Sequence, residues 1–353
     1  MPWQERIFPY RRPASAEPGR ARPVRGRRIL DGGPPDGLSG PSPHRGRRPR
    51  QSSAGNRENI VQQLRFGDIT VDRIVEAEGL GFPPQFLLPE SDGDAIRHYR
   101  DWLEPHFFDP ESGRFIQSVH CYVVRSPRHT VLIDTCVGNG KDRPSTRAWN
   151  RMDTDFLLRL RDLGVAPADV DYVLCTHLHV DHVGWNTRLL DGRWVPTFPN
   201  ARYLFHETEF EHWEKNGDYV LEGPGASDGF YEDSVLPVVE AGQAVFVVDG
   251  HAIDDWLTVE AWPGHSPGHV CLRLKAGGRE AVFAGDLLHH PVQCRHPDWN
   301  SRFCWDPALS AASRRRFVER HAETPAVILA AHFATPVAGR IAAPGGLTRF
   351  ETL

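Results

Sequence analysis

The stretch THLHVDHVGWN (176–186) limits more than any other feature how this chain can fold. It follows directly on the apolar run YVLC (172–175), which predicts a buried strand. Six consecutive positions of the stretch contain four potential metal ligands: His177, His179, Asp181 and His182. Histidine titrates near neutrality and is costly to bury without a partner. Such a cluster at the end of a buried segment therefore requires a bound ligand or ordered water molecules.

Residues 1–57 differ in composition from the rest of the chain. They contain 13 arginines, no lysine and four acidic residues, a net charge of +9, so that the other 296 residues carry −14. Ten prolines and eight glycines leave almost no periodic apolar positions, and such a segment cannot bury enough surface to offset its ordering entropy. We predict a disordered extension. We favour a solvated segment that the domain does not need over a tail that binds nucleic acid or an anionic surface, and a transit peptide is a third alternative.

The cysteines and the hydropathy indicate the compartment. The six cysteines are scattered without CxxC pairs, and most lie in apolar runs where free thiols pack as small hydrophobic groups. The chain has neither a basic start followed by a continuous apolar stretch nor about 18 uninterrupted apolar residues. We therefore expect a cytoplasmic protein with reduced cysteines, without a signal peptide and without a membrane span.

A single folded domain of the α/β class is predicted over 58–353, where apolar residues become periodic. Strands are predicted at 66–79, 118–126, 129–140, 171–175, 201–206, 244–250, 257–262, 269–274, 280–286 and 326–332, and helices at 152–163, 207–215 and 307–321. Many strands with few helices between them favour two β-sheets with helices outside over a single doubly wound sheet. The histidine cluster then lies at the carboxyl end of a strand, where α/β proteins commonly build their sites.

Three further polar groups stand at predicted strand ends: His269, Asp286 and His332. Residues two apart on an extended strand point to the same side, so that His177 and His179 can share one metal. Four neighbouring ligands cannot all close on one tetrahedral zinc without strain. The residues therefore favour two metals. The expected ligands of the first are His177, His179 and His269, those of the second are Asp181, His182 and His332, and Asp286 bridges the pair.

A metal pair of this kind has a definite chemistry. It lowers the pKa of a bridging water molecule toward neutrality, which supplies hydroxide, while the second metal polarises the substrate oxygen. Imidazole and carboxylate ligands without thiolate suit zinc, with iron and manganese as alternatives. We expect two Zn²⁺ per chain.

The motif THLHVDH resembles the HxHxDH signature of the metallo-β-lactamase superfamily. The resemblance extends from about 66 to 341 and includes, in that family's order, Asp134, the motif, GHSPGH, GD and a late histidine. It implies an αββα four-layer sandwich with a binuclear metal site. The ligands carried over are those named above, with His269 rather than His265 matching the second histidine of the PGHxxGH motif. DHVGWN, DLLHHPVQ and HFATPVAGRI look most like the lactonase and organophosphate-hydrolase branch.

One position departs from that branch. Its lactonases carry a tyrosine shortly after the bridging aspartate, whereas Leu287, Leu288, His289 and His290 follow Asp286 here. A histidine could donate a proton to a leaving group in the same place. The candidate catalytic residues are therefore Asp181 and His289, with His290 as an alternative.

The sequence allows two roles for several other residues. We expect Asp134 to orient ligand histidines rather than to bind metal. His265 is expected to order its loop, with replacement of His269 as the alternative. The aromatic residues of WNSRFCW (299–305) can line an apolar pocket or pack in the core. The acidic, loop-rich insert at 207–240 can be a substrate lid or a solvated surface.

The leading functional hypothesis is a binuclear zinc hydrolase that uses a metal-bridging hydroxide on an ester, lactone or organophosphate, a small-molecule substrate. The second hypothesis is a dioxygenase that contains a single iron ion and acts on sulfur compounds. Such an enzyme would leave His182 and His332 without metal. The third is a module that binds nucleic acid through the basic tail; the acidic folded part argues against a nucleic-acid partner. The oligomeric state stays open, with a homodimer as one alternative.

Overall fold

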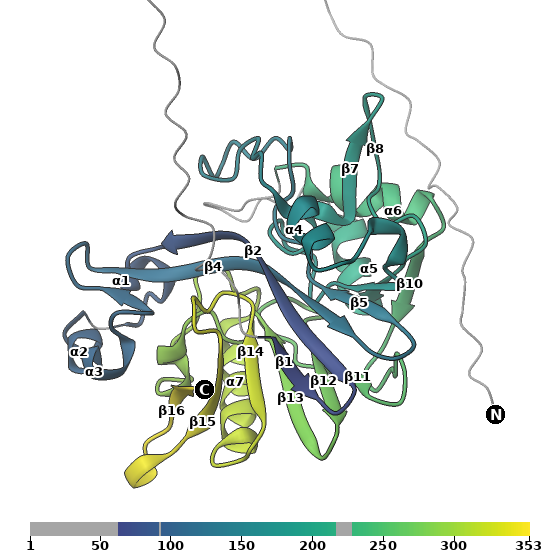
Figure 1. The fold of residues 1–353 in the computed structure, drawn as a ribbon. Helices are drawn as coiled ribbons and strands as arrows, with labels where there is room; N and C mark the ends of the chain where they lie inside the picture. Colours follow the sequence, from purple (N-terminus) through teal and green to yellow (C-terminus); the bar gives the residue numbers. More distant parts are fainter. Residues whose placement is uncertain (1–62, 92, 217–227) are drawn as a thin grey trace, which may run out of the picture. The chain divides into compact units, whose positions relative to one another are not determined.

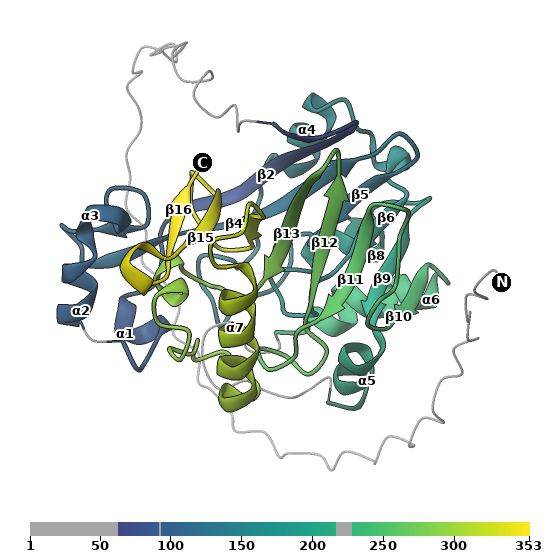
Figure 2. The same cartoon turned by 90° about the horizontal axis from the view of Figure 1, so that it is seen from below.

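Two β-sheets form the framework of the described part of the chain (Figures 1 and 2). The computed structural model describes residues 63–91, 93–216 and 228–353. The predictions for residues 1–57, the start of the domain at 58, and positions 217–227 of the insert lie outside the described residues.

The first sheet combines a parallel and an antiparallel part. Its strand order is β1 (Leu64–Phe66), β2 (Ile69–Leu80), β4 (Arg114–Arg125), β5 (Thr130–Ile133), β6 (Tyr172–Leu174), β9 (Arg202–His206) and β10 (Ala244–Val247), and β3 (Phe108–Asp109) pairs with β4. The strands from β5 to β10 are parallel, and the pairs from β1 to β5 are antiparallel. The motif thus leaves the carboxyl end of a central parallel strand, as predicted.

The second sheet follows chain order. It contains β11 (Leu257–Ala261), β12 (Val270–Ala276), β13 (Arg279–Gly285), β14 (Val327–Ala330), β15 (Ala338–Ala342) and β16 (Arg349–Thr352). All neighbours are antiparallel except β13 and β14. A separate hairpin is made by β7 (Thr187–Leu190) and β8 (Arg193–Pro196).

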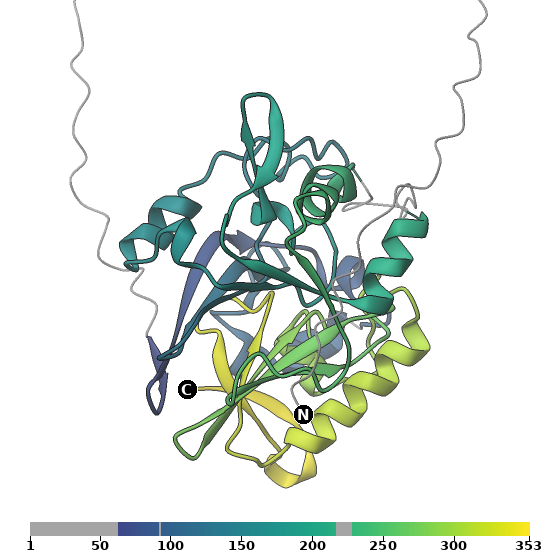
Figure 3. The same ribbon diagram turned by 90° about the vertical axis from the view of Figure 1, so that its right-hand side faces the viewer.

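Helices cover the outer faces of both sheets, which confirms the αββα sandwich (Figure 3). The first sheet carries α4 (Phe156–Asp162), α5 (Glu207–Asn216) and α6 (Leu236–Glu240); the second carries α7 (Pro307–His321). Shorter elements are α1 (Pro84–Leu87), α2 (Gly93–His98), α3 (Arg100–Leu103), η1 (Pro167–Asp169), η2 (Gly184–Asn186), η3 (Tyr231–Val235), η4 (Pro291–Cys294) and η5 (Pro344–Gly346). No helix among the described residues is long and apolar enough to cross a membrane.

Alternation along the strands builds the core on both faces of the first sheet. In β4, Tyr122 and Val124 pack with the second sheet, whereas Cys121 and Val123 pack with the helices. This is the two-residue period of an extended strand. Because both faces are covered, the central strands read as continuous apolar runs in the sequence.

The predicted elements from 66 to 332 are present, and the structure differs from the prediction in three further places. The sequence analysis missed the β7–β8 hairpin, although Asp191 and Gly192 at its turn both adopt positive φ (50° and 74°), the conformation that Asp-Gly favours in tight hairpins. It also missed β15 and β16. The insert at 207–240 was expected to be loop-rich apart from the predicted helix at 207–215, which is present as α5; the other described part of the insert is mainly η3 and α6.

Gly184, just after the motif, is a position where two loops touch. A Cβ atom there would lie 1.9 Å from the backbone carbon and oxygen of Val137. We expect Gly184→Ala to destabilise the protein by about 3 kcal/mol or more, because backbone on the other loop has to move. Gly278→Ala is the control, since nothing lies within 4 Å of that position and only its φ of +71° opposes a side chain, at a cost of about 1–2 kcal/mol. Urea unfolding measures both, and equal losses would contradict the close approach.

Candidate metal centre

Both sheets deliver polar side chains to the same place. The motif residues follow β6, His265 lies in the loop between β11 and β12, Asp286 directly follows β13, and His332 follows β14. All these side chains are buried or nearly so. Seven of them form two adjacent groups of potential metal ligands: His177, His179, His265 and Asp286 in the first, and Asp181, His182 and His332 in the second.

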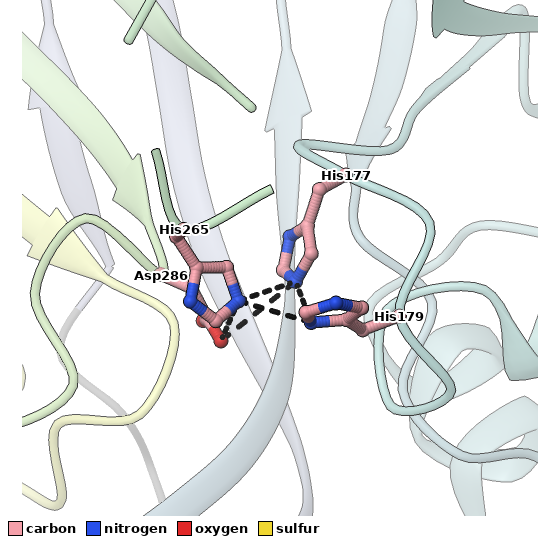
Figure 4. Close-up of side chains that lie close together, drawn as sticks. All are labelled: His177, His179, His265 and Asp286. Carbon is pink, nitrogen blue, oxygen red and sulfur yellow. Dashed lines mark hydrogen bonds and ion pairs between the residues drawn. The ribbon is translucent and has the colours of Figure 1, made fainter. Parts of the chain in front are cut away.

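The first group brings three ring nitrogens to one point (Figure 4). His177 Nε2 lies 2.9 Å from His179 Nδ1, and His265 Nε2 lies 3.1 Å and 3.0 Å from these two atoms. Asp286 Oδ2 is 3.3 Å from His265 Nε2. Three nitrogens of a tetrahedral zinc site are roughly 3.3 Å apart for Zn–N bonds of about 2.0 Å. The donor set therefore fits a zinc ion after a small outward movement.

The second group lies on the other side of the Asp286 carboxylate. Asp286 Oδ1 is 3.0 Å from His332 Nε2 and 3.4 Å from His182 Nε2. Asp181 is 3.7 Å from His182 Nε2 through Oδ1 and 3.6 Å from His332 Nε2 through Oδ2. The two oxygens of Asp286 thus face different groups, which is the arrangement of a bridging carboxylate.

Hydrogen bonds hold the far nitrogens of the ligand rings. His332 Nδ1 donates to the Ser118 carbonyl oxygen (3.0 Å), and His182 Nδ1 donates to Asp134 Oδ2 (2.9 Å). Thr176 Oγ1 donates to Asp134 Oδ2 (3.0 Å) and lies 3.1 Å from His177 Nδ1. These contacts orient each ring so that its Nε2 atom is directed at the centre. Asp134 makes the contact expected of a residue that orients a ligand.

The electrostatics of the two groups also fit cations. Burial lowers the pKa of His177 and His265 well below the usual value and that of His179 to about 3, so these rings are neutral, as metal ligands must be. Burial opposes protonation of His182 too, but the Asp286, Asp134 and Asp181 carboxylates outweigh it and raise its pKa. Its Nε2 atom is buried without a hydrogen-bond partner among the described residues. A metal ion would satisfy this atom.

The structure places His265, and not His269, in the first group. Our expectation for His269 therefore disagrees with the geometry. His269 Nε2 accepts a hydrogen bond from the Asp286 backbone N–H (3.0 Å), which occupies its lone pair. His269 immediately precedes β12, where its ring lies behind Asp286, whereas His265 comes from the preceding loop and reaches the centre. We take His265 as the proposed ligand.

The neighbouring histidines have separate environments. His289 is buried beside the centre, with Nε2 3.2 Å from Asp286 Oδ2, and it lines a cavity. His290 points away: its Nε2 donates to the Phe107 carbonyl oxygen (2.9 Å) and its ring stacks on Phe115. Of the aromatic residues at 299–305, Phe303 lines the cavity.

Glu209 of α5 is a residue that the sequence analysis missed. One of its carboxylate oxygens accepts hydrogen bonds from the Leu178 backbone N–H (3.0 Å) and Trp213 Nε1 (2.8 Å), and the other accepts from the Gly268 backbone N–H (2.8 Å). The buried carboxylate thus ties the motif loop to the loop that carries His265. Its only sequence signal was the four-residue spacing to Trp213 on a predicted helix.

A comparison with known protein families assigns the chain. The model described as the metallo-β-lactamase superfamily matches residues 115–332, which contain all seven grouped ligands. The chain belongs to this superfamily. The resemblance inferred from the motifs is therefore confirmed.

Two curated relatives are similar in sequence to about half of this chain. N-acyl homoserine lactonase AttM of Rhizobium radiobacter is 31% identical over 190 residues, covering 50% of this chain and 65% of that protein. Metallo-β-lactamase domain-containing protein 1 of Xenopus laevis is 32% identical over 188 residues, covering 53% of this chain and 58% of that protein. The chain thus spans less than two thirds of the length of these relatives.

Solved structures share the fold. The hydrolase AbOPH of the β-lactamase superfamily superposes with a TM-score of 0.67 at 24% identity, covering 82% of this chain and 96% of that one. AidC, a dizinc quorum-quenching lactonase, superposes with a TM-score of 0.65 at 16% identity, covering 83% and 97%. At these identities the likeness concerns the fold alone.

Glu209→Ala should weaken metal binding. Removal of the carboxylate leaves three buried donors without an acceptor and frees both loops of the first group, so we expect roughly tenfold lower zinc affinity, as for other residues that support metal ligands. Competition with a fluorescent chelator measures the affinity. Glu211→Ala on the same helix is the control, because Glu211 is exposed and its partner among the described residues is the exposed Lys215. Equal affinities in the two variants would contradict the positioning role.

Proposed function

We propose that the protein is a binuclear zinc-dependent hydrolase of carboxylic esters, lactones or organophosphates. The observation that carries this proposal is the position of Asp286, whose Oδ2 faces the first group of ligands and whose Oδ1 faces the second. The identity of the metal, the number of ions and the substrate are all part of the proposal.

The residues of the site have distinct roles in such a reaction. When bound, two ions supply a water molecule of lowered pKa as the nucleophile and polarise a carbonyl or phosphoryl oxygen. Asp286, Asp181 and the five histidines of the two groups would hold the ions. The buried setting of these side chains excludes bulk water and strengthens their electrostatic effect on the substrate.

A cavity of about 500 Å³ opens over both groups. His179, Asp181 and His289 line its metal end, and its other walls include Leu80, Phe82, Leu87, Trp149 and Phe303. Pockets of this size and apolar lining hold small organic molecules. A substrate with an apolar acyl or alkyl part beside the scissile bond therefore fits best.

His289 is suited to protonate the leaving group. Its ring lies next to those of His265 and His332, at centroid distances of 4.8 Å and 5.8 Å, so it borders both groups. Its Nδ1 atom is buried without a partner among the residues that the structure describes. A proton donor in this position would neutralise the alkoxide that forms when a lactone or ester opens.

The names of the curated relatives favour lactones among the proposed substrates. Several curated relatives are N-acyl homoserine lactonases, AttM of Rhizobium radiobacter among them. A lactone with an apolar acyl chain also agrees with the cavity described above. The alternative of a mononuclear iron dioxygenase leaves His182 and His332 without metal, although Asp181 and Asp286 converge on them. The nucleic-acid alternative concerns residues outside those described.

The first test is the metal content of protein purified without added metal, by elemental mass spectrometry. We expect about two zinc ions per chain, and fewer in His332→Ala, because that ring belongs to the second group. His98→Ala, an exposed histidine of α2, should keep the wild-type content. One iron ion per chain that is unaffected by His332→Ala would contradict the proposal and favour the dioxygenase.

The second test concerns His289. We expect His289→Ala to lower kcat about 100-fold for alkyl esters and lactones with little change in KM, because a proton donor acts mainly in the transition state. For 4-nitrophenyl esters, whose leaving group needs no proton, the loss should be much smaller. His289→Tyr should restore part of the rate. A loss that is independent of the leaving group would show that His289 acts only through packing or through the metal ligands.

A further inference from the structure

We propose that the cavity end remote from the metal ligands is a carboxylate-binding subsite formed by Arg114 and Gln117. This inference rests on the proposed function and narrows its substrate class. The preferred substrate is an ester or lactone that carries a second, free carboxylate, separated from the scissile bond by an apolar spacer.

Arg114, at the start of β4, is held beside the cavity by a hydrogen bond to backbone. Its Nε atom donates to the Gly81 carbonyl oxygen (2.7 Å), and the side chain lines the cavity. No hydrogen bond or ion pair joins its two terminal nitrogens to any residue in the described ranges. A guanidinium presents these nitrogens as a planar pair that matches the two oxygens of a carboxylate.

Gln117 supplies a second donor from the same strand. Its backbone lies next to Ser118, and its side chain reaches the segment 81–82 that also holds Arg114. Its Oε1 atom accepts a hydrogen bond from the Phe82 backbone N–H (3.0 Å), which leaves the Nε2 amide group for a ligand. Gly81 makes this contact possible, since a Cβ atom there would lie 2.3 Å from Gln117 Oε1. Both side chains are thus fixed on the 81–82 segment before any substrate binds, so little ordering is needed on binding.

The charges around the cavity favour an anion at this end. Arg114 is the one lysine or arginine among the described residues that line the cavity. Of the acidic lining residues, Asp181 and Asp286 belong to the metal ligands, and Glu78 is paired with Arg73 (3.1 Å). Among the described residues, no carboxylate forms an ion pair with this guanidinium, so its charge can pair with a carboxylate of a ligand.

The distance between the two ends defines the spacer. Ser118 of β4 marks the metal end, because its carbonyl oxygen accepts from His332 Nδ1. Arg114 lies four residues earlier on the same strand, a separation of about 13 Å. Leu80, Phe82 and Phe303 line the cavity as well. An apolar chain of medium length can bridge this distance, with its carboxylate at Arg114 and its ester at the metal ligands.

The experiment compares two series of 4-nitrophenyl esters with the zinc-loaded enzyme. One series consists of monoesters of dicarboxylic acids from glutaric to sebacic acid, and the other of fatty acid esters of the same chain lengths. At the chain length that spans the cavity, we expect wild-type kcat/KM to be at least about tenfold higher for the carboxylate-bearing ester, the effect of a charge-assisted hydrogen bond. Arg114→Met should remove this preference while leaving the fatty acid esters within about threefold, and Arg114→Lys should retain part of it.

Controls separate this inference from the proposed function. Arg161→Met, on the exposed face of α4, changes the net charge equally and should keep the preference. A wild-type enzyme that hydrolyses both series equally, or an Arg114→Met variant that loses both activities in parallel, would overturn the subsite. If no ester is hydrolysed, the proposed function fails. Calorimetric binding of suberate to wild type, and its loss in Arg114→Met, then still tests the subsite; equal binding to both would refute it.

Discussion

The shared carboxylate of Asp286 is the contact on which the centre depends. It directly follows β13 of the second sheet, yet its two oxygens face His265 on one side and His182 and His332 on the other. The close approach at the end of β13 requires Gly285, since a Cβ atom there would lie 2.6 Å from His269 Nε2 and 2.9 Å from Thr176 Oγ1. The packing of the two sheets and the geometry of the centre are therefore one constraint.

Burying so many polar groups is costly unless each finds a partner, and the fold supplies these partners in layers. Thr176, Asp134 and the Ser118 carbonyl group contact the outer nitrogens of the ligand rings. The Glu209 carboxylate accepts hydrogen bonds from the two loops that carry ligands. These contacts leave the ligand atoms themselves directed at the centre. The arrangement is preorganised, so that metal binding needs only small movements.

The sequence predicted most of the framework because the relevant signals are local. The apolar runs located the strands, and the spacing of His177, His179 and His182 predicted a metal site. The choice between His265 and His269 was wrong by the geometry, because both fit PGHSPGH and only the start of β12 at Val270 decides which ring reaches the centre. Glu209 escaped notice because its role depends on contacts with two distant loops. Arg114 and Gln117 likewise acquire meaning only through the register that pairs β4 with β2 and brings Gly81 beside them.

The two ends of the cavity are formed by different elements of the fold, so that specificity can change independently of the metal ligands. The metal end uses strand ends from both sheets, so that most changes there disturb the fold. The remote end uses the start of β4 and the segment after β2, where Arg114 and Gln117 each depend on a single hydrogen bond to backbone. Substitutions at the remote end can therefore change the group that is recognised while the centre keeps its geometry. A fold organised in this way can hold one reaction constant and vary the substrate, which is how one superfamily serves many functions.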